Sequence, residues 1–105
     1  MKHNFTNNNG VVIFYFRGKL NFTNLDGNDI IETIKSAKHV TFDLQDVDYI
    51  SSSFIRLCLV TSKTVGLKQL SIVNVNSFTL KLFHTTGLDK ILDISLSPTL
   101  QHAQH

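Results

Sequence analysis

The sequence is poor in the features that anchor a chain to a membrane or cross-link it. Cys58 is the only cysteine, so no disulfide can form within the chain. Its place in the apolar run of residues 54–60 favours a small buried thiol. Residues 1–9 lack the apolar core of a signal peptide, and no hydrophobic run is long enough to span a bilayer. We therefore expect a cytoplasmic protein without direct membrane insertion.

The spacings of common catalytic and ligand-binding motifs are also missing. The five glycines are isolated and form no phosphate-binding loop. The ten Lys and Arg residues are scattered, without the basic stripe that a nucleic-acid surface requires. Of the histidines, only His102 and His105 lie close together, and a pair without a third ligand is a weak metal site. We predict no metal, no cofactor, no nucleic-acid partner and no enzymatic activity.

The chain does contain enough hydrophobic residues to form one small core. Hydrophobic residues make up 42% of the 105 residues and charged residues 17%, with a formal net charge of +2. This composition is typical of a folded globular protein, and the length suits a single domain. We expect one domain over residues 1–105, with its core at about residues 11–94 and a short tail at each end.

Strand and helix patterns alternate along this domain. β-branched and aromatic runs predict strands, and apolar residues at helical spacing predict helices. The expected strands are residues 11–16, 40–44, 70–75 and 91–94, and the expected helices are residues 29–37, 53–65 and 77–86, with a helical turn after Ser95. This order predicts an α/β fold: a mixed, mostly parallel β-sheet of four to five strands packed with three to four helices.

The predicted loop of residues 45–50 joins the second strand to the second helix. Asp43, Asp46 and Asp48 gather there, at a strand end where α/β folds place their sites. No base or nucleophile at a fixed spacing accompanies them. Solvated loop carboxylates are the expected explanation.

Three serines, Ser51, Ser52 and Ser53, follow this loop at the start of the second predicted helix. Serine is a favoured N-cap, because its hydroxyl can accept a hydrogen bond from a free N–H group. A phosphate at the same place would be stabilised by the helix dipole and by free N–H donors. Phosphoserine adds close to two negative charges, enough to repel an acidic or apolar partner surface. A structural cap and a phosphorylation switch both remain open.

At this point the sequence resembles a known family. The segment from Val40 to Phe54 resembles the STAS domain segment written as a strand followed by V-x-[FY]-[IM]-D-S-S-G. Residues 16–21 resemble the family's G-x-L-D turn, residues 70–75 its L-x-L-x-N-V strand, and residues 78–92 its helix closing with G-L-x-x-[IL]-[IFL]. The resemblance runs in order from about residue 11 to residue 94. It implies a STAS-like sheet backed by helices.

The family resemblance also implies a function. Anti-sigma factor antagonists of this family bind an anti-sigma factor kinase, which releases a sigma factor, and the kinase phosphorylates a serine at the start of the second helix. Alignment with D-S-S-G implies Ser53 as the phosphoacceptor, with Ser52 before it. The resemblance predicts a partner surface on the loop and on the exposed part of the second helix: Asp46, Asp48, Tyr49, Ser51, Phe54 and Arg56.

Three departures from the family pattern keep a second function open. Ser51 stands at the position of the family's aspartate, Phe54 at that of its glycine, and Asn21 at that of the second aspartate of G-x-L-D. A phenylalanine beside the acceptor could obstruct a kinase, or it could fill the core. The alternative is a STAS adaptor subunit of a lipid-transport ABC complex, which needs no phosphorylation. A small-ligand sensor is a third candidate, and the chain is expected to be a monomer or weak homodimer.

Overall fold

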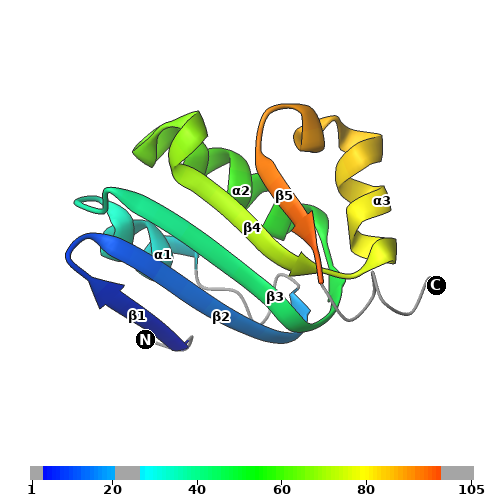
Figure 1. The fold of residues 1–105 in the computed structure, drawn as a ribbon, viewed down its shortest axis with the longest axis horizontal. Helices are drawn as coiled ribbons and strands as arrows, with labels where there is room; N and C mark the ends of the chain where they lie inside the picture. Colours follow the sequence, from blue (N-terminus) through cyan, green and yellow to red (C-terminus); the bar gives the residue numbers. More distant parts are fainter. Residues whose placement is uncertain (1–3, 21–26, 98–105) are drawn as a thin grey trace.

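A five-stranded sheet with helices packed behind it forms the described part of the chain (Figure 1). The computed structural model describes residues 4–20 and 27–97. The strands are β1 (Asn4–Asn8), β2 (Val11–Leu20), β3 (His39–Ile50), β4 (Leu70–Val75) and β5 (Asp93–Leu96). The helices are α1 (Gly27–Ile34), α2 (Ser52–Val65) and α3 (Ser77–Thr86), with 3-10 turns at Leu67–Gln69 and Leu88–Lys90.

The strands lie in the order β1-β2-β3-β4-β5. β1 pairs with β2 in antiparallel fashion, whereas β2, β3, β4 and β5 pair in parallel. Parallel neighbours need a crossover, and the segments carrying α1, α2 and α3 provide the three crossovers. The predicted α/β fold, with its mixed and mostly parallel sheet, is confirmed.

The hairpin of β1 and β2 is the part that the sequence analysis missed. It placed residues 1–10 in a short tail and predicted no strand before residue 11. Asn9 and Gly10 both have positive φ, 54° and 90°, as the two central residues of a tight type I′ hairpin do. Three of the five residues of β1 are asparagines, which have little strand propensity, so pairing with β2 is what makes it a strand.

β3 is longer than predicted, and the expected loop of residues 45–50 is wrong. These residues continue the strand to Ile50, because β2 also continues past residue 16, the predicted end of its strand, as far as Leu20. The two extensions pair with each other, from Arg17 with Asp46 to Leu20 with Ile50, across irregular register shifts. Gly18, with φ of 73°, sits at one of these shifts.

Other element ends differ from the prediction by a few residues. α1 begins before Asp29 and ends at Ile34 rather than Ala37. The last strand begins at Asp93 rather than Ile91, because a 3-10 turn precedes it, and it takes in Ser95, where a helical turn was expected. α3 ends at Thr86, as predicted, and is followed by Gly87 in the left-handed conformation and by the buried Leu88. Asn21, His102 and His105 lie outside the described residues.

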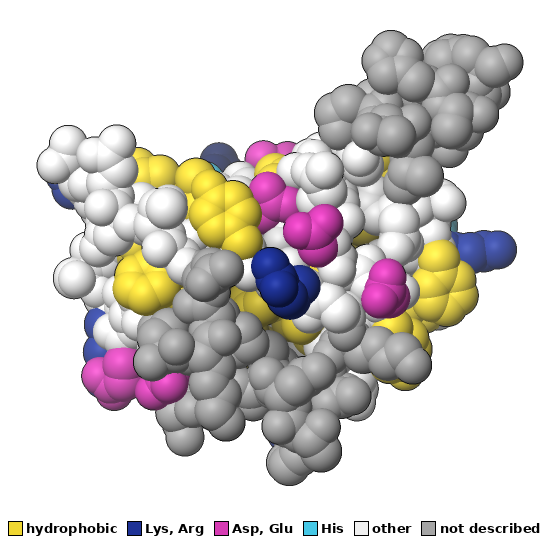
Figure 2. All heavy atoms as spheres, turned by 90° about the horizontal axis from the view of Figure 1, so that it is seen from below, with side chains coloured by type: hydrophobic (Ala, Val, Ile, Leu, Met, Phe, Trp, Pro, Cys, Tyr) yellow, Lys and Arg dark blue, Asp and Glu magenta, His cyan; other side chains and the backbone are white. Residues whose placement is uncertain are grey.

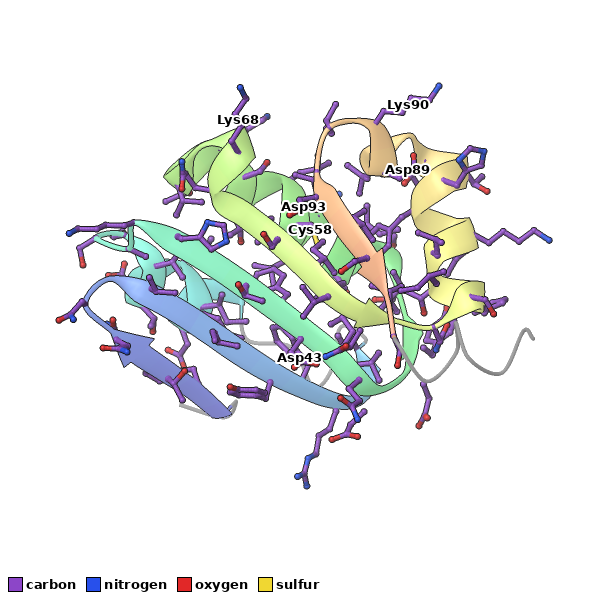
Figure 3. All side chains as sticks on the ribbon, in the orientation of Figure 1. Asp43, Cys58, Lys68, Asp89, Lys90 and Asp93 are labelled. Atoms are coloured by element: carbon purple, nitrogen blue, oxygen red, sulfur yellow. The ribbon has the colours of Figure 1, made fainter. Side chains whose placement is uncertain are left out.

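The core lies between the sheet and the helices, and an aromatic cluster forms its centre. Phe16 packs edge-on against Phe42 and Phe54, with ring centroids 5.2 and 5.3 Å apart. Phe14 stacks on Phe16 at 6.0 Å. Cys58 is buried behind the sheet on α2 (Figure 3), and burial raises the pKa of its thiol.

The opposite face of the sheet carries none of the helices of residues 4–20 and 27–97 (Figure 1). Side chains on it are therefore half-buried or exposed, among them Val11 and Tyr15 of β2. A polar ladder crosses this face at the amino end of the parallel strands. His39 Nε2 lies 3.1 Å from Ser71 Oγ, and that hydroxyl donates to Asp93 Oδ2 at 3.2 Å. The ladder joins β3, β4 and β5.

Candidate functional site

The candidate site lies at the carboxyl edge of the sheet. β3 and β4 are parallel, so both end at the same edge, and α2 and α3 both begin there (Figure 1). α/β folds place their sites at this edge, because strand ends and helix N-termini converge on it. The predicted serines and the predicted partner residues all follow or end β3. The residues that the sequence analysis predicted for a site therefore lie together at this edge.

Ser51 is the N-cap residue of α2, but its hydroxyl does not cap the helix. Its carbonyl accepts hydrogen bonds from the N–H groups of Phe54 and Ile55 at 3.1 and 3.2 Å. Its own N–H donates to the Leu20 carbonyl at 2.9 Å, which ties the helix start to the end of β2. Its side chain makes no capping hydrogen bond. The predicted capping role of the serine hydroxyls is thus not realised at Ser51.

The hydroxyls of Ser51 and Ser53 are instead bonded to each other, with 2.6 Å between the two Oγ atoms. Ser53 is half-buried, whereas Ser52 is exposed. Among the described residues, no acceptor is found for the backbone N–H groups of Ser52 and Ser53. The first turn of α2 also contains no acidic side chain. The helix start therefore keeps free donors and its positive dipole end for an anion.

The predicted partner residues separate into surface and core. Asp46, Asp48 and Tyr49 are exposed on the last residues of β3, and Arg56 is exposed on α2. Phe54 is fully buried in the aromatic cluster, with its ring 5.7 Å from that of Phe42. Its side chain fills the core, offers nothing to a partner and adds no bulk at the surface beside Ser53.

Asp43 differs from the other two aspartates. It is half-buried, and its Oδ1 accepts hydrogen bonds from the Gln45 N–H at 3.0 Å and from Asn74 Nδ2 at 3.1 Å. Asp43 therefore ties β3 to β4 rather than serving as a solvated loop carboxylate. Asn74 meets it from a left-handed conformation, with φ of 59°. Asp46 and Asp48 are solvated as expected, although on a strand.

One exposed aromatic residue at this edge was not predicted as a site residue. Phe78, in the first turn of α3, is 58% exposed. The sequence analysis placed it among the apolar positions of a short helix. The neighbouring Thr79 and Phe83, four residues apart, form the buried side of α3, and Phe78 lies off that stripe. Figure 2 shows hydrophobic side chains beside an acidic one at the right of the molecule, the side of α3 in Figure 1.

The described residues suggest neither a metal centre nor a membrane span. No group of three or more His, Cys, Asp or Glu side chains within residues 4–20 and 27–97 could hold a metal ion. No helix in this part of the chain is long and apolar enough to cross a membrane. The ladder of His39, Ser71 and Asp93 lies at the amino end of the strands, away from the serines. The chemistry available at the carboxyl edge is recognition by exposed polar and aromatic groups.

Comparison with known proteins identifies the family. The family model of the STAS domain matches residues 3–103. The chain therefore belongs to the STAS domain family, as the resemblance predicted. No curated protein matched the sequence significantly.

Solved structures confirm the fold of this family. A STAS-domain anti-sigma factor antagonist from Planctomyces limnophilus superposes with a TM-score of 0.78 at 19% identity, covering 92% of this chain and 91% of that one. The antagonist SpoIIAA in its unphosphorylated form gives 0.73 at 14% identity, with 88% and 86% covered. Bacillus SpoIIAA in its phosphorylated form gives 0.67 at 13% identity, with 98% and 99% covered. At these identities the likeness establishes the fold alone.

Proposed function

We propose that this chain is a partner-switching regulator of the anti-sigma factor antagonist type. It binds a protein partner, an anti-sigma factor with serine kinase activity, at the carboxyl edge of its sheet. Phosphorylation at the start of α2 ends that binding, and a phosphatase restores it. The protein acts in the cytoplasm, without a cofactor and without catalytic activity of its own.

The observation that carries this proposal is the exposed and uncapped start of α2. Ser52 is exposed, Ser53 is half-buried beside it, and the first turn has no acidic side chain. A phosphate on either serine would be stabilised by the free N–H groups of the same turn and by the helix dipole. It would also bring close to two negative charges to the centre of the proposed contact surface.

The surface around these serines suits a protein partner. Asp46, Asp48 and Tyr49 project from β3 on one side, and Arg56 lies one turn along α2 on the other. Tyrosine and arginine are enriched among the residues that carry binding energy in interfaces. We propose these residues, with Ser51, as the contact surface. Phe54 supports that surface from the core.

A binding experiment with phosphate-mimicking variants tests the proposal. Each anti-sigma factor kinase of the host is purified, and its affinity for the wild-type chain is measured by calorimetry. We expect Ser53→Asp or Ser52→Asp to weaken binding of the recognised kinase by at least about tenfold, because like charge and desolvation oppose docking. Ser36→Asp is the matched control, since Ser36 is exposed in the turn that precedes the amino end of β3.

Kinase assays complete the test. Incubation with the recognised kinase and ATP should add one phosphate, which mass spectrometry should locate at Ser53 or Ser52. Unchanged affinity in both aspartate variants, together with no phosphate on either serine, would refute the switch.

One observation favours a second candidate function. The Ser53 hydroxyl is half-buried and already bonded to Ser51, which replaces the family's aspartate. Such a hydroxyl suits a constitutive adaptor, and a STAS adaptor subunit of a lipid-transport ABC complex needs no phosphorylation. This function predicts binding to the transporter's ATPase subunit with the same affinity in wild type and Ser53→Asp.

A further inference from the structure

The most exposed large hydrophobic side chain of the described residues lies at the candidate site. Phe78 is 58% exposed, more than Tyr49 at 44% or Ile91 at 48%. An aromatic ring left in water does not help the fold, whereas buried in an interface it contributes a large apolar area. Its neighbours Thr79 and Phe83 already provide the packing of α3 on the core.

A hydrogen bond fixes Phe78 to the same edge as the serines. Asn76 caps α3 by accepting the Thr79 N–H at 2.7 Å, and its Nδ2 donates to the Val47 carbonyl of β3 at 3.3 Å. The start of α3 is therefore fastened to the strand that leads into Ser52. Val47 and Ser52 are five positions apart in the chain, a distance of at most about 17 Å even when fully extended. A typical interface of about 800 Å² per partner is roughly 30 Å across, so it covers both the start of α3 and the serines at the start of α2.

The charge around Phe78 indicates what kind of surface it meets. Neither α2 nor α3 contains an acidic residue, and both helices begin at this edge with the positive ends of their dipoles. Lys81 is exposed and lies three residues after Phe78, on the neighbouring part of the helix surface. Arg56 adds an exposed positive charge on α2. Asp46 and Asp48 put negative charge on the β3 side of the same edge, so the positive charge lies on the side of the two helices. A partner surface with an apolar pocket and with carboxylates opposite the helices complements this arrangement.

We propose that the first turn of α3 is a second contact for the partner that binds the start of α2, a contact anchored by Phe78 and flanked by Lys81. This inference rests on the proposed function and adds to it. The partner has an apolar pocket for the phenyl ring and carboxylates placed for Lys81 and Arg56.

Calorimetry with the purified host kinase that binds the wild-type chain tests this contact. Phe78→Ala is expected to weaken binding by at least about tenfold, as a buried aromatic anchor does. Lys81→Glu is expected to weaken binding and to reduce its dependence on salt. Ile91→Ala is the matched control, because Ile91 is also exposed and lies beyond the opposite end of α3. It is expected to bind like wild type.

The outcomes separate this inference from the proposed function. If wild type binds a kinase and Phe78→Ala binds equally well, the second contact is refuted and the proposed function stands. If no host kinase binds the wild type, both are refuted.

Amide shift mapping on the labelled chain gives a readout without substitution: kinase should shift the signals of Phe78 and Lys81 but not that of Ile91. Thermal unfolding of each variant shows that the fold is kept.

Discussion

At the residue scale, the paired hydroxyls of Ser51 and Ser53 are the most specific feature of the proposed switch. The short distance between them makes each serine the partner of the other rather than of the helix backbone. A kinase that phosphorylates Ser53 meets a hydroxyl that is already hydrogen-bonded to its neighbour. Ser51, which stands at the position of the family's aspartate, is thus the hydrogen-bond partner of Ser53 in this chain.

A double-mutant cycle measures this hydroxyl pair. Ser51→Ala, Ser53→Ala and the double variant are compared by urea unfolding. We expect a coupling free energy of about 0.5–1 kcal/mol, the usual net contribution of a neutral hydrogen bond. Purely additive effects would show that the bond does not contribute in solution.

Phe54 gives a second prediction at this scale. It is fully buried among Phe16 and Phe42. Phe54→Ala should therefore lower the free energy of unfolding by about 3–5 kcal/mol, through lost burial and a cavity. Phe78→Ala removes the same side chain from an exposed position and should change stability by less than about 0.5 kcal/mol. Similar losses in the two variants would contradict the assigned burial.

At the scale of elements, the two helices at the carboxyl edge begin differently. The Asn76 side chain caps α3, whereas the Ser51 side chain leaves α2 uncapped. Asn76→Ala should cost about 1–2 kcal/mol of unfolding free energy, because the cap and the bond to Val47 are both lost. Ser51→Ala should cost less. Equal costs, measured by thermal unfolding, would mean that Ser51 caps α2 in solution.

Elements with strong local signals were predictable from the sequence. α3 has an Asn cap, apolar positions at helical spacing and a closing glycine, and its predicted ends were correct. The second half of β3 has no such signal, because Asp46 and Asp48 resemble loop residues. Only pairing with the extension of β2 makes this segment a strand. Local propensity cannot report a partner strand that lies far away in the sequence.

The residues of the candidate site also divide into those that the sequence could suggest and those that it could not. The serines and Arg56 could be proposed from the sequence because the family motif and the helix start coincide there. The exposure of Phe78 depends on which side of α3 faces the core, and that side is set by tertiary packing. The burial of Phe54 also depends on tertiary packing, because its apolar run is compatible with a surface position and with a core position.

At the scale of the whole molecule, the buried thiol of Cys58 makes stability depend on pH. Burial raises its pKa, so the folded protein holds this proton where the unfolded chain has lost it. The unfolded state then binds fewer protons, and the free energy of unfolding falls as the pH rises above the ordinary thiol pKa. Below that pKa this contribution is fully present.

Denaturant unfolding across this alkaline range checks the effect. We expect the wild type to lose stability more steeply with rising pH than Cys58→Ala, which has no thiol to titrate. Comparing slopes rather than absolute stabilities removes the cost of the small cavity in the variant. Parallel slopes would contradict the assigned burial of the thiol.

Chemical labelling of the same thiol can report conformational opening of the native chain. Alkylating reagents attack thiolates, and Cys58 is both shielded from solvent and held in its protonated form. Labelling therefore requires a local opening of the fold that exposes the inner side of α2. With no other cysteine in the sequence, each labelled molecule records one such opening. Labelling rates with and without a bound partner would thus measure how far docking at the carboxyl edge reduces the opening of the core around Cys58.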